Sequence, residues 1–183
     1  MTTSQDLLCL TVAALKGDEV VAPTDARDRV FSPGDWPTQS DQYPLLKVRL
    51  LSETKQSLGK GGIMFRVTAT IRILAEVSEP VQFENAGATA AEIAIWRLVR
   101  QCECGVINSY PLTGLLQEFP SIRTELASSS ESATHLAGAQ IDIDMEFIQD
   151  ANDFAPLPVS DLTEIEFDDT AHPGAGLTVP LSQ

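Results

Sequence analysis

The sequence predicts an α+β domain in which a mixed, mainly antiparallel β-sheet with a long hairpin packs against two or three helices. The main observation is the stretch MFRVTATIRILAE at residues 64–76, where apolar and polar side chains alternate from Phe65 onward except at Leu74. Side chains of an extended strand point to opposite faces in turn, so this stretch is expected to be a long strand with one buried face. Runs at 45–51 and 140–148 are the other two observations, and they predict further strands.

Helices are predicted at two places. Residues 4–16 have apolar side chains at helical spacing, Thr3 and Asp6 are spaced as a capping box, and Gly17 is a natural stop. The strongest helical pattern covers residues 88–101, with Gly105 as its expected stop. The apolar face of that second helix consists of Ala91, Ala94, Ile95, Leu98, Val99 and Cys102.

A projecting loop is predicted between the strands at 45–51 and 63–76. The joining segment 52–62 is too long for a tight two-residue turn, so it is expected to project from the sheet as a flexible loop. Trp36, in an earlier Pro-containing segment, can be read as a binding residue or, more simply, as an aromatic ring packed on the edge of the core. The candidate contact residues are Glu53, Lys55, Gln56, Leu58, Lys60 and Trp36.

No cofactor is predicted. The LGKGG sequence at 58–62 places Gly61 after Lys60, where a phosphate-binding loop requires Ser or Thr. It also joins strand to strand, whereas such a loop delivers its amides at a helix N-terminus. Cys102 and Cys104 have no second cysteine pair, and both histidines lie far away in the sequence, so these thiols are interpreted as structural or incidental rather than as zinc ligands.

The polar face of the strand at 140–148 carries Asp142, Asp144 and Glu146. Carboxylates on one strand face can hold a divalent cation or perform acid–base catalysis. The simpler interpretation is a solvated outer face whose charges prevent aggregation, and it is favoured because no histidine or fourth ligand accompanies the row. Neither catalytic residues nor a metal site are therefore predicted.

Charge divides the chain unevenly. The net charge is −14, the last basic residue is Arg123, and twelve acidic residues follow it. Clustered Lys and Arg are needed to bind phosphates, so this balance argues against a DNA-gripping surface, although DNA could slide past an acidic one. Residues 1–150 are expected to form the α+β domain, and 151–183 an acidic, Pro-containing C-terminal extension.

The sequence suggests a protein that is made in the cytoplasm and does not enter a membrane. No apolar run reaches the roughly 18 residues of a membrane span, and the N-terminus lacks the basic region and cleavage site of a signal peptide. Three cysteines fit a reducing compartment.

The order of these elements resembles the tail terminator (tail completion, minor tail protein U-like) proteins of long-tailed bacteriophages. The resemblance covers about residues 4–149 and rests on a pattern of elements, with no invariant motif. After an N-terminal helix, the shared layout consists of a Pro-rich segment with Arg29-Val30-Phe31 and Pro37, the strand entry Tyr43-Pro44-Leu45-Leu46-Lys47-Val48, a projecting loop, the long alternating strand 65–71, the helix 88–101 and the closing strand 141–147.

The resemblance implies a non-enzymatic structural subunit of the virion, made in the host bacterial cytoplasm. Such subunits form a ring, typically a hexamer, that caps the tail tube, ends its polymerisation and joins the tail to the head connector. The implied partners are copies of the same chain, the tail tube protein and the head–tail connector or neck protein, with DNA passing through the lumen without specific binding. The extension at 151–183 goes beyond the family pattern.

Three other functions remain open. The chain could be another head–tail connector, neck or tail subunit with a similar sheet. It could be a small metal-dependent enzyme that uses Asp142, Asp144 and Glu146. It could also be a cytoplasmic adaptor whose acidic tail engages a basic partner.

Overall fold

The computed structural model describes residues 2–17, 22–33, 42–80, 83, 86–131, 134–155, 164–167 and 177–180. The fold is α+β, as predicted: a five-stranded, mainly antiparallel sheet is combined with three α-helices in the described part of the chain. Contacts divide the chain into two units, Met1–Asp153 and Phe154–Gln183. The first unit contains the five-stranded sheet and the helices, and the second contains a small antiparallel pair, β6 (Glu164–Phe167) with β7 (Leu177–Pro180).

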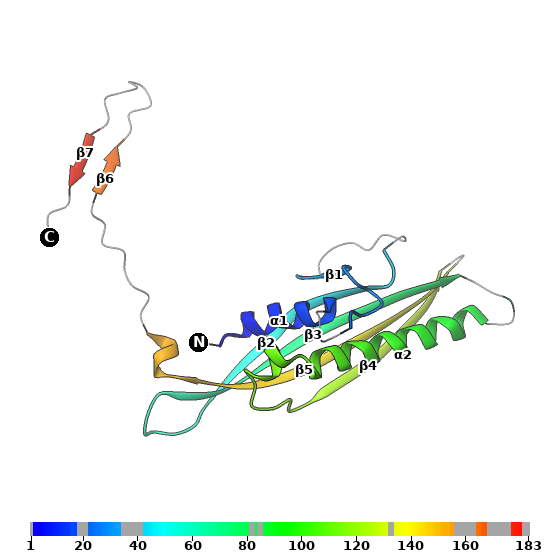
Figure 1. Ribbon diagram of the computed structural model, residues 1–183, viewed down its shortest axis with the longest axis horizontal. Helices are drawn as coiled ribbons and strands as arrows, with labels where there is room; N and C mark the ends of the chain where they lie inside the picture. The colour runs from blue at the N-terminus through cyan, green and yellow to red at the C-terminus, as the bar shows by residue number, and fades with distance from the viewer. Residues whose placement is uncertain are drawn as a thin grey trace. The chain divides into compact units, whose positions relative to one another are not determined.

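The sheet is built around two long central strands (Figure 1). β3 and β5 pair antiparallel over their whole lengths, from Met64 opposite Asp150 to Pro80 opposite Thr134. β2 pairs antiparallel with β3, β4 pairs antiparallel with β5, and β1 adds a short parallel edge to β2. The strand order is β1 (Val30–Phe31), β2 (Leu45–Ser57), β3 (Met64–Pro80), β5 (Thr134–Asp150) and β4 (Ile122–Glu131).

The helices pack on one face of this sheet. α1 (Ser4–Lys16) contacts β2 and β1, whereas α2 (Ala86–Ile107) contacts β3 and β5, and the short α3 (Tyr110–Thr113) packs on α1. The predicted capping box is present, because the Thr3 hydroxyl accepts from the Asp6 amide and the Asp6 carboxylate accepts from the Thr3 amide. Gly17 ends α1, as predicted.

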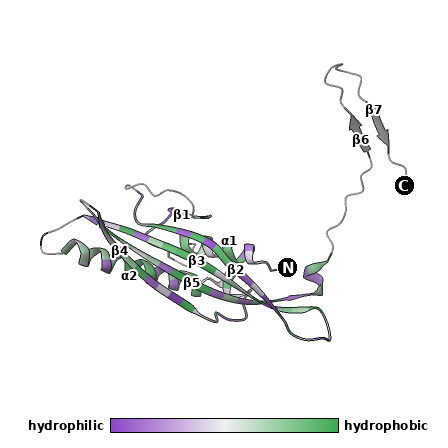
Figure 2. Cartoon of the chain, turned by 180° about the vertical axis from the view of Figure 1, so that it is seen from behind, coloured by the Kyte–Doolittle hydropathy of each residue, from purple (hydrophilic) through white to green (hydrophobic). Residues whose placement is uncertain are grey.

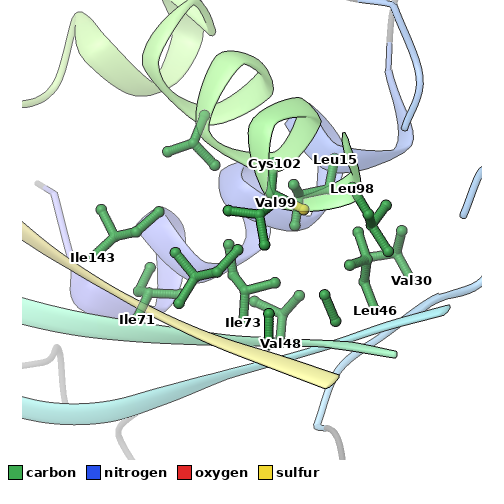
Figure 3. Packing of buried hydrophobic residues seen from close by; sticks show 14 of the residues in the cluster. Leu15, Val30, Leu46, Val48, Ile71, Ile73, Leu98, Val99, Cys102 and Ile143 are labelled. Atoms are coloured by element: carbon green, nitrogen blue, oxygen red, sulfur yellow. The ribbon is translucent and has the colours of Figure 1, made fainter. Parts of the chain in front are cut away.

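The core forms where the apolar side chains on one face of the strands pack against the apolar faces of the helices (Figure 3). Hydrophobic and hydrophilic residues alternate along the central strands (Figure 2), and the apolar set is turned toward α1 and α2. Burial of each large aliphatic or aromatic side chain stabilises the fold by about 1.5–3 kcal/mol relative to leaving that side chain exposed. Fully buried members include Leu7, Leu15, Leu46, Ile71, Ile73, Ile95, Leu98, Leu112, Ile141, Ile143 and Phe147.

Gly105 does not end the second helix, which corrects the sequence prediction. α2 continues to Ile107 and begins at Ala86, so it is longer at both ends than the predicted 88–101. A Cβ at position 105 would lie 3.4 Å from the backbone oxygen of Ala14 in α1. The glycine therefore permits the close approach of two helices, a role that a single-sequence pattern cannot distinguish from a helix stop.

The predicted loops are mostly strand. β2 runs on to Ser57, so the loop predicted at 52–62 shrinks to residues 58–63. β4 continues through a Ser-rich segment to Glu131, and β5 begins at Thr134 rather than at the predicted residue 140. These strand segments are polar and lack the alternation of apolar residues, so the sequence pattern did not predict them. They are held in the sheet by backbone hydrogen bonds to the neighbouring strand. The predicted C-terminal extension contains β6 and β7.

Substitution of Ile71 by Ala tests the core. Ile71 is fully buried at the centre of β3, so the substitution should lower the free energy of unfolding by about 2–5 kcal/mol through lost burial and a residual cavity. Chemical denaturation measures this change. The matched control is Ile93→Ala on α2, where the side chain is 65% exposed and the expected change is within about 0.5 kcal/mol. Equal destabilisation by both variants would contradict the core assignment.

Candidate functional site

The acidic row lies on the sheet face that the helices leave open. Asp142, Asp144 and Glu146 occupy alternate positions of β5, and their register partners on β3 are Arg72, Thr70 and Thr68. The row is therefore placed over the centre of the sheet, between β3 and β4, and is not at an edge.

Asp142 forms the strongest contact of this row. The guanidinium of Arg72 donates from Nε to Oδ1 at 2.7 Å and from Nη2 to Oδ2 at 2.8 Å, which is a bidentate ion pair. Gln140 Nε2 donates to Oδ2 at 3.1 Å. Hydrogen bonding from Arg72 holds the pKa of Asp142 below its ordinary value, and the same contact raises the pKa of Arg72.

The other two carboxylates are also engaged. Asp144 accepts from the Thr70 hydroxyl at 2.6 Å and from the Ser121 hydroxyl at 2.7 Å. Arg66 Nε lies 3.1 Å from Glu146 Oε1. Each carboxylate of the row thus has a donor from a neighbouring segment of the chain, and no three His, Cys, Asp or Glu side chains converge as a metal site within the described residues. This geometry favours a hydrogen-bonded outer face over the catalytic interpretation.

A β-bulge decides where Glu53 and Lys55 point. Leu50 pairs with Ile71 and Ser52 with Thr70, so Leu51 is an extra residue in β2. An extra residue reverses the facing of every side chain that follows it. Before the bulge Leu46 and Val48 face the core, and after it Glu53 and Lys55 turn to the helix side.

Glu53 and Lys55 consequently belong to a polar cluster under the start of α1. Lys55 Nζ donates to Gln149 Oε1 at 2.8 Å and lies 3.3 Å from Glu53. Gln149, only 3% exposed, donates from Nε2 to the Thr2 oxygen at 2.9 Å. The Ser4 hydroxyl donates to Glu53. Glu53 and Lys55 thus lie within β2, outside the projecting loop in which the sequence analysis placed them.

The remaining candidate residues separate into three groups. Gln56 is exposed near the end of β2, opposite Arg66 on β3. Leu58 and Lys60 are exposed at the end of the β2–β3 hairpin, as the loop prediction requires. Trp36 lies outside the described residues.

Two exposed apolar residues beside this loop were missed from the sequence. Ile63 and Met64 follow the glycines directly and are exposed at the hairpin end. Their signal was an apolar pair immediately after a Gly-rich turn, at a place where solvent-exposed hairpin ends are usually polar. They join Leu58 and Lys60 as candidate contact residues.

The three cysteines do not converge. Cys9 is exposed, Cys104 is partly buried, and Cys102 packs in the core beside Leu15 and Val99 (Figure 3). Burial raises the pKa of the Cys102 thiol to about 12, which keeps it neutral and unreactive. A packing role for Cys102 follows.

Comparisons with known proteins provide no further assignment. No protein-family model matches the chain, and no curated protein matches its sequence. Among the described helices, none is both long enough and apolar enough to cross a membrane. The functional argument therefore rests on the residues and their geometry.

Substitution of Asp142 by Asn tests the bidentate pair. The variant should be less stable by about 1 kcal/mol at neutral pH, because Arg72 loses its counter-charge in a partly solvated site. A lowered carboxylate pKa contributes stability above about pH 4, and this contribution is lost as the pH falls through the folded-state pKa. The difference between wild type and variant should therefore shrink in acid, as measured by urea denaturation at several pH values. Asp28→Asn, at an exposed position, is the control, and a pH-independent difference for Asp142→Asn would refute the role of the pair.

Titration with Mn²⁺ or Ca²⁺ tests the enzyme alternative. We expect no saturable binding to the row, since Asp142, Asp144 and Glu146 already accept from neighbouring donors. Isothermal titration calorimetry of the wild type and of Asp144→Ala makes the comparison. A saturable site that disappears in Asp144→Ala would support the metal-dependent alternative instead.

Proposed function

We propose that this chain is a structural virion protein, a ring-forming tail terminator that caps the tail tube of a long-tailed bacteriophage and joins the tail to the head connector. The proposal starts from the order of elements that carries the sequence resemblance. The same order, an N-terminal helix, a long hairpin, a long helix and a closing strand, is present as α1, β2–β3, α2 and β5.

The observation that carries the proposal is the end of the β2–β3 hairpin. It extends past α1 and α2 at one end of the sheet (Figure 1), and its large apolar side chains are exposed. Leu58, Ile63 and Met64 are exposed by 42%, 60% and 44%. Apolar side chains gathered on a projecting element indicate a contact surface, because their exposure is unfavourable in an isolated subunit.

The hairpin is also anchored well enough to act as a rigid arm. β2 and β3 pair as far as Ser57 opposite Phe65, and β5 flanks the same part of β3 on its other side. The cluster of Lys55, Gln149 and Thr2 ties this end of the sheet to the N-terminal segment. A rigid arm loses little conformational entropy when it binds, which favours assembly.

The charge distribution suits a ring through which DNA passes. Lys47, Arg66 and Arg72 on the open face are paired with carboxylates of the same chain, and Arg49 and Arg123 lie in register with Arg72 and Asp142. Carboxylates are thus interspersed among these cations, which do not form the unbroken basic cluster that phosphate binding requires. The partners of the proposed ring are the tail tube and the head–tail connector, at the head-proximal end of the tail.

The mass of the full chain in solution, alone and with purified tail tubes, tests the proposal. Light scattering at several concentrations should reveal a discrete ring-sized species, or a monomer that assembles only on tubes. Electron cryomicroscopy of the tube sample then places the subunit, and density away from the tube end would favour another neck or tail subunit. A monomer that ignores tubes at every concentration would rule the proposal out.

A further inference from the structure

A shallow hollow lies on the open face of the sheet around Gly138. Two adjoining depressions of about 260 and 280 Å³ share Glu76, Ala127 and Gly138 in their linings. The small residues Gly138 and Ala127 form the floor, because the larger side chains of Leu74, Leu136 and Glu125 surround them.

Glycine is not required by the backbone at position 138. A Cβ there would meet only the backbone oxygens of Ala75 at 3.7 Å and Ala127 at 3.8 Å, which are ordinary contact distances. Glycine in a strand interior weakens the strand. The effect of Gly138 on this face is thus to leave space on the surface.

The charged residues of the hollow are all acidic. Among the described residues, Glu76 and Glu125 are its charged lining residues, and no described Lys or Arg takes part in the lining. Glu76 is paired with Lys47 at 2.9 Å. Glu125 is exposed, its charge assists the Asp142 hydrogen bond in raising the pKa of Arg72 on β3, and it adds negative charge to a largely apolar depression.

The hairpin end has the complementary chemistry. Within residues 58–64, Lys60 is the sole charged residue, and Leu58, Ile63 and Met64 are exposed. A Cβ at Gly59, Gly61 or Gly62 would meet nothing within 4 Å, so this end is slender. It presents apolar side chains and one positive charge on a narrow projection.

One molecule cannot bring its own hairpin end to its own hollow. Met64 pairs with Asp150, whereas Glu76 pairs with Gly138, twelve residues further along the same ladder. At about 3.3 Å per residue the two places are about 40 Å apart on a continuous sheet. The hollow can therefore receive this projection only from another molecule.

We propose that the β2–β3 hairpin end of one copy docks into the Gly138 hollow of the next, with Leu58 and Ile63 seated on its floor and Lys60 paired with Glu125. This inference rests on the proposed function and specifies its subunit contact. Because the two surfaces differ, the contact is head-to-tail, and repetition of such a contact closes a ring when the rotation permits.

Charge reversal in the full chain tests the contact. Lys60→Glu and Glu125→Lys should each weaken assembly, alone or on tail tubes, by about tenfold or more, since each places like charges together. The double variant should restore assembly to within about threefold of wild type. Lys16→Glu, an exposed cation on α1, is the matched control and should leave assembly unchanged.

Filling the hollow provides an independent test. Gly138→Leu should abolish assembly while the monomer keeps its thermal stability, and Gly138→Ala should have a smaller effect.

Disulfide trapping tests the same contact directly. Ile63→Cys and Ala127→Cys chains, when mixed and oxidised, should form more disulfide-linked dimer than either variant forms alone. If the wild type assembles but the charge reversals, Gly138→Leu and the cysteine pair have no effect, the docking is refuted and the proposed function stands. If the wild type never assembles, the proposed function fails as well.

Discussion

The pairing of β3 with β5 is the constraint on which the rest of the structure depends. Their register extends without interruption from Met64 opposite Asp150 to Pro80 opposite Thr134. Within this ladder the pair Ile71–Ile143 faces the helices, and the next pair, Arg72–Asp142, faces away from them. If β5 slipped by one residue along β3, its apolar side chains would turn to solvent and Asp142 would move away from Arg72. Both the core and the open face therefore favour the same register.

The bulge at Leu51 couples the sheet to its projecting end. Without the extra residue, Glu53 and Lys55 would remain on the open face, and the start of α1 would lose the contacts that Ser4 and Gln149 make with them. With it, a polar cluster holds the N-terminal segment close to the place where the hairpin leaves the helices. The exposed apolar residues at the hairpin end are thus carried on a braced support, which is what an assembly contact requires.

The features that could be predicted are those whose signal is local. Alternation at 64–76 identified β3, helical spacing and Thr3 with Asp6 identified α1, and the acidic row was recognised as one polar face. Features that depend on residues distant in the sequence were not predicted. Polar strand continuations and the bulge depend on pairing with another strand, and the Arg72 and Thr70 partners of Asp142 and Asp144 lie 70 and 74 residues away in the sequence. The Gly138 hollow exists only where three strands meet.

The sequence by itself determined the class of fold, the principal strands and helices, and which side chains of each element are buried. These features follow from the spacing of apolar residues within a short segment. Tertiary structure alone decided which side chains are engaged by other groups of the same chain and which stay exposed to solvent. Glu53 and Lys55 are bound internally, whereas Leu58, Lys60 and Ile63 are exposed. That division depends on strand register, and register is a property of the whole ladder rather than of any segment within it.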